Sequence, residues 1–368
     1  MKVIISGGGT GGHIFPAISI ANALRNADPS VEILFVGAQG KMEMEKVPAA
    51  GYEIVGLPVA GFYRQLNLRN IARNIVLPFK LIGSLYQASN IIRRFRPDVA
   101  VGVGGYASGP VLYLAARNGV RCLVQEQNSF PGVTNRILST RVDKICVAYP
   151  NMERFFPKEK IILTGNPVRQ SLVSNASRQE AAEAFGLDPS RKVILVIGGS
   201  LGARSINEGI LQSLNTMDGS AQILWQTGSY YYDSIRAKLG AMPHKDVVAT
   251  AFVKRMDLAY ALADIVVSRA GASSISELAL LGKPTILVPS PNVSEDHQTK
   301  NARALETQGA AIMVSDSNTA KLICVAQQTL ADSAKLTSLG DNIATFARPN
   351  AADDIAREVM ALAKAKKN

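Results

Sequence analysis

Short apolar runs alternate with longer amphipathic segments along the whole chain. Each run is flanked by Gly, Pro, Asn or Asp, which is the pattern of buried strands separated by helices. The predicted strands are 3–5, 32–36, 53–57, 98–103, 122–125, 144–148, 161–163, 192–197, 222–226, 246–249, 264–268, 284–288 and 311–314. Strands that alternate with helices are typical of parallel sheets covered on both faces. The pattern therefore predicts an α/β fold.

The series of strands opens twice in the same way. A strand at residues 3–5 leads into a glycine loop and a helix at 14–25, with Pro16 in the first turn of that helix. A strand at 192–197 leads into a second glycine loop and a helix at 205–214. This repetition predicts two doubly wound, Rossmann-like domains that face a cleft, because ligands bind at the carboxyl ends of parallel strands.

The predicted domain limits follow from the helix- and strand-breaking residues of the segment 164–169. Residues 1–164 form the first domain and residues 165–345 the second. Residues 346–368 contain a last helix, at 351–367, that is free to pack back on the first domain.

The first glycine loop, Gly7–Gly12, allows three interpretations. It satisfies the dinucleotide fingerprint G-x-G-x-x-G, but the strand at 32–36 ends without the acid that would hold a ribose. A tight turn without a ligand is the second interpretation. The third is an anion site at a helix N-terminus, with His13 at the mouth of the loop as one of only three histidines.

Charge is distributed unevenly. The net charge is +11, of which +9 falls in residues 1–165 and +2 in the remainder. Residues 54–97 contain no Asp or Glu, and basic residues are interspersed with apolar ones, with Pro78 dividing the segment into two helical pieces. Two core-facing helices with a basic outer side would explain this segment. A surface that binds anionic phospholipid would also explain it. The residues predicted for such a patch are Arg69, Arg73, Ile75, Leu77, Phe79 and Lys80.

Composition excludes several classes. Three scattered cysteines among 368 residues fit a reduced protein better than a disulfide framework. The chain begins directly with a strand, without the pattern of a signal peptide, and no apolar run is long enough to span a bilayer. Stacking aromatics are sparse, so we expect no nucleic-acid partner. Metal-like spacing, a phosphate loop with Gly-Lys-Ser/Thr and a nucleophile elbow are all missing from the sequence.

Three further stretches carry candidate chemistry. Gly102–Gly109 is another strand–glycine–helix unit, which together with the first loop would suit a lipid diphosphate. Asn128 follows a strand end and would bond sugar hydroxyls, although it and Glu126 could equally be loop caps. In the third stretch, Ser268–Glu277, backbone N–H groups would face a phosphate and Glu277 a ribose, unless Ser274 and Glu277 form a capping box.

These motifs together resemble one family, in matching order from residue 3 to about 302. The motifs that carry the resemblance are Gly7–His13, Phe15–Ala17, Glu126–Asn128, Gly165–Arg169, Gly198–Ala203, Arg269–Glu277, Asp296–Gln298 and Asn301–Ala302. The chain is similar to the inverting glycosyltransferases of family 28, which have the GT-B fold. The resemblance implies the activity of certain bacterial members of this family. These enzymes transfer N-acetylglucosamine from UDP-N-acetylglucosamine to the 4-hydroxyl of a lipid-linked muramyl-pentapeptide in peptidoglycan synthesis.

The resemblance also implies a donor site. Its residues are Thr10, Gly11, Gly12, Asn128, Arg169, Ser200, Val253, Ala272, Ser273, Ser274, Ile275, Ser276, Glu277 and Gln298. Arg169 and Ser200 would contact the diphosphate, the backbone of Val253 would contact uracil, and Glu277 would contact the ribose. Because inversion needs one base for the acceptor proton, His13 is our first candidate and Glu126 the second. No cofactor is expected, and no metal is obligatory for this chemistry.

The implied partners are the undecaprenyl-diphosphate-linked muramyl-peptide acceptor, an anionic phospholipid surface and other proteins of cell-wall synthesis. The implied location is the cytoplasmic face of the bacterial cell membrane, as a peripheral protein. Two alternatives stay open at this point. They are a UDP-N-acetylglucosamine 2-epimerase, which would not need the acid-free segment, and a UDP-sugar-binding module without activity.

Overall fold

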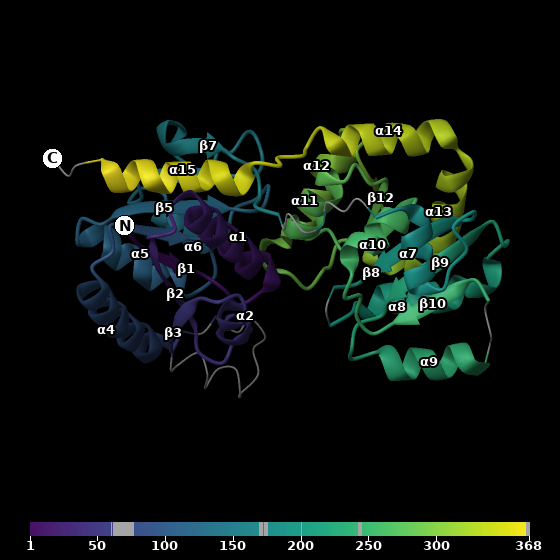
Figure 1. Cartoon of the computed structure of the whole chain (residues 1–368), viewed down its shortest axis with the longest axis horizontal. Coiled ribbons are helices and arrows are strands. Elements are labelled where there is room, and N and C mark those ends of the chain that lie inside the picture. Colours follow the sequence, from purple (N-terminus) through teal and green to yellow (C-terminus); the bar gives the residue numbers. More distant parts are fainter. Residues whose placement is uncertain are drawn as a thin grey trace. The chain divides into compact units, whose positions relative to one another are not determined.

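The structure, a computed structural model, describes residues 1–59, 61, 77–168, 172, 176–199, 201–241 and 245–365. The chain divides into two compact units (Figure 1). Unit 1 contains residues 1–168 and 348–368, and unit 2 contains residues 169–347. Each unit is built on one parallel sheet, as the alternation of strands and helices predicts.

Unit 1 has a seven-stranded sheet of order β3-β2-β1-β4-β5-β6-β7. Its strands are β1 (Lys2–Ser6), β2 (Glu32–Ala38), β3 (Glu53–Leu57), β4 (Val99–Gly102), β5 (Arg121–Glu126), β6 (Lys144–Val147) and β7 (Ile161–Leu163). Its helices are α1 (Gly11–Ala27), α2 (Glu43–Ala49), α4 (Leu77–Phe95), α5 (Ser108–Arg117), α6 (Val133–Leu138), α15 (Ala351–Lys364) and the 3-10 turn η1 (Lys158–Lys160).

Unit 2 has a six-stranded sheet of order β10-β9-β8-β11-β12-β13. Its strands are β8 (Lys192–Ile197), β9 (Ala221–Gln226), β10 (Val247–Thr250), β11 (Ile265–Ser268), β12 (Thr285–Leu287) and β13 (Ile312–Met313). Its helices are α7 (Arg178–Phe185), α8 (Arg204–Ser213), α9 (Tyr232–Ala241), α10 (Met256–Leu262), α11 (Ala272–Leu280), α12 (His297–Glu306), α13 (Leu322–Ala331) and α14 (Ser333–Ala344), with 3-10 turns η3 (Leu214–Thr216), η4 (Ser294–Asp296) and η5 (Asp316–Lys321).

Successive residues of each buried strand serve opposite faces of the sheet, because side chains alternate along a strand. In β1, Val3 and Ile5 pack with α1 and α15 on one face, whereas Ile4 packs with α4 and α5 on the other. Helix α15 joins unit 1 through Ile355 and Val359, which pack with the apolar side of α1. Both faces of the sheet are therefore covered, and all the predicted strands are present with shifts of one or two residues at their ends.

The first helix differs from the prediction. It begins at Gly11 rather than Ile14, so Pro16 is the sixth residue of α1 and does not lie in its first turn. The N–H groups of His13 and Ile14 both bond to the carbonyl oxygen of Thr10, at 3.1 Å each, which makes Thr10 the N-cap residue. Low helix propensity of glycine suggested a later start, but propensity is overridden here by the tertiary contacts of the loop.

Pro78 was expected to separate two helical pieces. It lies in the first turn of α4, where proline is tolerated. The preceding piece lies outside the described residues. In the part of the chain that the structure describes, no helix is long and apolar enough to cross a bilayer.

Candidate functional site

The strand orders place the glycine loops where a ligand is expected. In both sheets the order reverses beside the first strand of the unit, between β1 and β4 and between β8 and β11. Open parallel sheets bind ligands outside the carboxyl ends of the strands at such a switch point. The loops that leave these four strands are Gly7–Thr10, Val103–Ala107, Gly198–Ala203 and Arg269–Gly271. Each unit therefore has one candidate site.

In unit 1 the two glycine loops pack directly on one another. A Cβ atom added to Gly105 would lie 2.5 Å from the carbonyl oxygen of Gly8, and Gly105 has a φ of +84°. Only glycine fits this close backbone approach. The first loop is thereby held between β1 and the loop that follows β4, and it presents Thr10, Gly11 and Gly12 at the start of α1.

His13 lies in the first turn of α1 and is half-buried. Its Nδ1 atom is 3.1 Å from the carbonyl oxygen of Gly8 and 3.2 Å from Thr10 Oγ1. A carbonyl oxygen only accepts, so Nδ1 carries the proton and Nε2 is the basic nitrogen of the neutral ring. Nε2 faces Gly104, since a Cβ atom there would lie 3.0 Å from it.

Glu126, at the end of β5, organises the loop that contains Asn128. One oxygen of its carboxylate accepts the backbone N–H of Asn128 at 3.0 Å, and the other accepts the N–H of Gly132 at 3.1 Å and Asn135 Nδ2 at 2.9 Å. Asn128 Nδ2 also donates to Glu126, at 3.2 Å. Burial raises the pKa of the Glu126 carboxyl, and the hydrogen bonds it accepts act in the opposite direction. This arrangement suits loop organisation, so the geometry favours His13 over Glu126 as the base.

Glu43, at the start of α2, was not among the predicted site residues. Its side chain is 1% exposed and lies beneath the first glycine loop. One oxygen accepts the N–H of Gly9 and the other the N–H of Ala38, both at 2.9 Å. Glu43 lies seven residues beyond the predicted strand 32–36, whereas the dinucleotide fingerprint requires an acid at the end of that strand. Only the tertiary contact therefore reveals Glu43.

In unit 2 a pocket of about 480 Å³ opens at the ends of β8 and β11. Its lining includes residues of the glycine loop, Arg269 and Gln298, all of which belong to the motifs described in the sequence. Residues that line the pocket without having been predicted are Arg204, Ser205, Glu208, Tyr231, Ser290, Asn292 and Asp316. Arg204, Ser205 and Glu208 lie on α8, directly after the glycine loop, whereas Tyr231, Ser290, Asn292 and Asp316 come from other segments that no local motif connects.

Arg269 is fixed at the floor of this pocket. Its guanidinium pairs with Asp316 at 2.5 Å, donates to Ser205 Oγ at 2.8 Å and donates to the carbonyl oxygen of Val288 at 3.1 Å. A planar fork with several donors suits such multiple pairing. Gln298 accepts the backbone N–H of Ser290 at 2.9 Å and so supports the loop after β12.

Helix α11 begins at Ala272, with Gly271 as an N-cap residue that makes no side-chain cap. The alternative of a capping box is therefore wrong, because Ser274 is already the third residue of the helix and Glu277 the sixth. Ala272, Ser273 and Ser274 form the first turn, whose N–H groups point out of the helix end. Ile275 is buried in the core, and Ser276 Oγ donates to the carbonyl oxygen of Ala272 at 3.0 Å.

Glu277 and Val253 each form a hydrogen bond with another residue of unit 2. Tyr260 donates its hydroxyl to Glu277 at 3.2 Å. The N–H of Val253 donates to Gln226 Oε1 at 2.9 Å, so a base contact at this residue would use its carbonyl oxygen. Two further predicted donor residues, Arg169 and Ser200, lie outside the described residues.

The predicted membrane patch is only partly described. Arg69, Arg73 and Ile75 lie outside the described residues, and Leu77, Phe79 and Lys80 lie in the first turn of α4. Phe79 and Lys80 are exposed. Three more apolar side chains of α4, Leu81, Ile82 and Tyr86, are also exposed and were not among the residues predicted for the patch.

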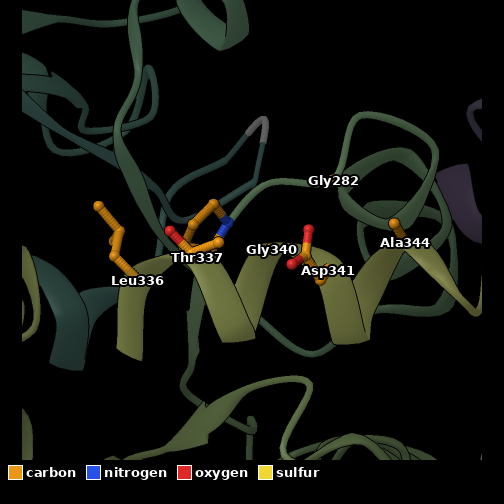
Figure 2. Close-up of a pocket in the computed structure, with 7 residues that line it drawn as sticks. Gly282, Leu336, Thr337, Gly340, Asp341 and Ala344 are labelled. Atoms are coloured by element: carbon orange, nitrogen blue, oxygen red, sulfur yellow. The ribbon is translucent and has the colours of Figure 1, made fainter. Parts of the chain in front are cut away.

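A second hollow of about 360 Å³ lies against α14 (Figure 2). It forms where Gly340 approaches the turn at Gly282, and a Cβ atom added to Gly340 would lie 3.0 Å from the carbonyl oxygen of Gly282. Asp341 is the one titratable side chain of its lining. None of the predicted residues lines it, so we assign the candidate site of unit 2 to the first pocket. Across the described ranges, no cluster of three or more His, Cys, Asp or Glu side chains could hold a metal ion.

Two Rossmann-like units, each with a glycine loop and a helix N-terminus at its switch point, make up the GT-B fold. Residues 3–147 match the glycosyltransferase family 28 N-terminal domain, and residues 193–355 match the glycosyltransferase family 28 C-terminal domain. The chain belongs to glycosyltransferase family 28.

Individual proteins agree with this assignment. The chain is 55% identical to the UDP-N-acetylglucosamine–N-acetylmuramyl-(pentapeptide) pyrophosphoryl-undecaprenol N-acetylglucosamine transferase of Parabacteroides distasonis, over 98% of this chain and 97% of that protein. The crystal structure of Acinetobacter baumannii MurG is 28% identical with a TM-score of 0.78, and 98% of this chain and 99% of that one are covered.

A UDP-GlcNAc 2-epimerase from Neisseria meningitidis, solved with UDP-GlcNAc bound, has a TM-score of 0.67 at 14% identity, over 98% of this chain and all of that one. At this identity the likeness shows the fold alone. The A. baumannii structure confirms the predicted fold class, and the two family 28 domain matches confirm the assignment to glycosyltransferases.

Proposed function

We propose that this glycosyltransferase transfers N-acetylglucosamine from UDP-N-acetylglucosamine to the 4-hydroxyl of a lipid-linked N-acetylmuramyl-pentapeptide, with inversion. The observation that carries the proposal is the geometry of His13 in a chain that matches transferases of this name over almost its whole length. Peptidoglycan synthesis is the process in which this product would be used.

The chemistry is a single in-line displacement. The acceptor oxygen forms a bond to C1 of the donor sugar, the bond from C1 to the UDP oxygen breaks, and the acceptor proton passes to a base. His13 is suited to that role because its Nδ1–H donates to Gly8, which makes Nε2 the basic nitrogen of the ring. The developing charge on UDP would be met by the helix N-termini of α8 and α11 and by Arg169, so no metal is required.

One assay separates this function from its rivals. Incubate the protein with labelled UDP-N-acetylglucosamine and a lipid-linked muramyl-peptide acceptor, and follow the label. Transfer of label into the lipid phase supports the proposal. Conversion of the nucleotide sugar to its manno epimer would instead identify an epimerase, and binding of UDP without either reaction would identify a non-catalytic module.

We also propose that unit 1 binds the cytoplasmic face of the cell membrane through α4. Phe79, Ile82 and Tyr86 recur with helical spacing and are 72%, 65% and 70% exposed. The opposite side of the helix, with Ala88 and Ile92, packs in the core of the unit. An exposed apolar stripe opposite a buried one, in a helix whose only charged residues are basic, suits insertion between anionic headgroups.

The expected strength of this contact is modest and testable. Each Lys or Arg near an anionic surface contributes about 1 kcal/mol, and each apolar side chain that leaves water contributes roughly 1.5–3 kcal/mol. In sedimentation with vesicles that contain phosphatidylglycerol, we expect the wild type to pellet. Loss of pelleting is expected for Phe79→Ser/Ile82→Ser and for Arg69→Glu/Arg73→Glu/Lys80→Glu.

A matched control is available in the same unit. Arg357, on α15, has a side chain that is 71% exposed, so Arg357→Glu changes the net charge of unit 1 without touching α4. This variant should pellet like the wild type. Undiminished pelleting of both α4 variants would refute the membrane face.

A further inference from the structure

A single peptide group connects Glu43 to His13. The N–H of Gly9 donates to Glu43 Oε2 at 2.9 Å, and the carbonyl oxygen of Gly8 lies 3.1 Å from His13 Nδ1. These two atoms belong to the same peptide unit, the one between Gly8 and Gly9. A carboxylate is therefore bound at one end of a peptide dipole and an imidazole at the other.

The position of Glu43 is determined by its surroundings. Its second oxygen accepts the N–H of Ala38, at 2.9 Å, so both oxygens of the carboxyl group are held by backbone donors. The space for the side chain exists because of two glycines. A Cβ atom on Gly8 would lie 2.2 Å from Glu43 Oε1, and one on Gly37 would lie 2.6 Å from Glu43 Cγ.

Hydrogen bonds at the two ends of a peptide group strengthen one another, because each polarises the group in the same sense. A carboxylate at the Gly9 N–H makes the Gly8 carbonyl oxygen a better acceptor for His13 Nδ1–H. In serine proteases a carboxylate that contacts the histidine directly selects the productive tautomer. Here the same result would be reached with a peptide unit between the two side chains.

We propose that Glu43 is a positioning residue that acts through the Gly8–Gly9 peptide to hold His13 in its Nδ1–H tautomer, with Nε2 turned to the substrate. The inference rests on the proposed role of His13 as the base. A purely structural role for Glu43, as a lock for the turn after β2, would affect stability and leave the tautomer unchanged.

The tautomer can be measured directly by ¹⁵N NMR of the imidazoles, in the alkaline range where a histidine ring is neutral. The chain has only three histidines, so His244→Gln and His297→Gln variants assign the signals. We expect the Nδ1–H form for His13 in the wild type, a mixture in Glu43→Gln and a larger Nε2–H fraction in Glu43→Ala. An Nε2–H form in the wild type would overturn the proposal even if both variants failed to fold.

Asp143 provides the matched control. Its carboxylate also accepts a backbone N–H in unit 1, that of Cys122 at 2.7 Å, but it lies at the amino ends of the strands. Asp143→Asn should lower stability, because it also weakens the ion pair with Arg121 at 2.7 Å, and should leave the His13 tautomer as in the wild type. An unchanged tautomer in both Glu43 variants would refute the link.

Kinetics complete the test. In Glu43→Gln we expect kcat to fall about 10- to 100-fold, less than the 10²–10⁴-fold typical of losing a general base, with the donor KM within about twofold. Adding Glu43→Gln to His13→Ala should cause no further loss, because both act on the same proton transfer. If His13→Ala keeps full turnover, the role of base fails, whereas the NMR result still decides whether Glu43 controls the tautomer.

Discussion

The two glycine loops that open the two units share a backbone plan but are supported by opposite chemistry. Beneath the loop of unit 1, Glu43 accepts the N–H of Gly9. At the loop of unit 2, Gln226 Nε2 donates to the carbonyl oxygen of Gly199, at 3.1 Å. In one loop an N–H therefore donates to a buried carboxylate, and in the other a carbonyl oxygen accepts from a side-chain amide.

This difference fits two different tasks. A buried carboxylate near a base favours the state in which that base has taken up a proton. Gly198, Gly202 and Ala203 of the second loop line the pocket together with two basic side chains, Arg204 and Arg269. This difference agrees with the proposed division of roles, in which unit 1 supplies the base and unit 2 binds the diphosphate of the donor.

The largest effect that this division predicts is on His13. In His13→Ala, kcat should fall by about 10²–10⁴-fold, because the acceptor proton loses its base. Donor affinity, measured by titration with UDP-N-acetylglucosamine in a calorimeter, should remain nearly unchanged. Full turnover of this variant would show that His13 is not the base and that the two loops do not differ in this way.

A smaller effect on the opposite parameter is expected in unit 2. Glu277→Ala should weaken UDP binding about 10- to 100-fold, because hydrogen bonds to a charged group contribute roughly 1.5–3 kcal/mol. Tyr260→Phe, which removes the hydroxyl that bonds Glu277, serves as the milder control. Equal UDP affinity in Glu277→Ala and the wild type would contradict a ribose contact at this acid.

A change of polarity at the second loop tests the comparison itself. Gln226→Glu replaces the donor that faces Gly199 with an acceptor, while the Val253 N–H can keep its partner. Two acceptors in contact cost about 1–2 kcal/mol, so UDP should bind about 5- to 30-fold more weakly. Gln226→Leu removes the hydrogen bond to Gly199 without adding a second acceptor, so it measures the loss of the bond apart from the repulsion. Tighter UDP binding by Gln226→Glu would show that the supporting charge does not set the task of the loop.

The smallest effect concerns the pH dependence of stability. Burial raises the pKa of Glu126, so its folded form favours the protonated state. Its contribution to stability is then fully present below the unfolded pKa and is lost as pH rises through the folded pKa. The Tm of the wild type minus that of Glu126→Gln should therefore decrease by a few degrees from acidic to neutral pH. If this Tm difference instead increased with pH, the pKa of Glu126 would be lowered on folding and the prediction would be wrong.

Much of the fold was accessible from local sequence. Apolar runs such as 192–197 place every strand, because a strand buried on both faces must be apolar throughout. Glycines after β1, β4 and β8 mark the switch points, since only glycine allows the close backbone approach found between Gly8 and Gly105. The family, too, is carried by these local motifs.

The start of α1 and the start of α11 were less accessible. Gly11 and Gly12 have low helix propensity, and Ser274 with Glu277 imitates a capping box, so local signals misplaced one helix start and left the other ambiguous. In both cases the packing of the preceding loop decides where the helix begins. Boundaries are where local preference is weakest relative to tertiary contacts.

The sequence by itself determined the layered α/β architecture, the glycine loops and the family, because each depends on residues that are neighbours along the chain. Only the tertiary structure decided which side chains support those loops. Glu43, Gln226 and Asp316 reach their partners across 34, 27 and 47 positions, to Gly9, Gly199 and Arg269 respectively. Such pairings arise when parallel strands bring their carboxyl ends together, and hydrogen bonds depend on distance in space and not on separation along the chain.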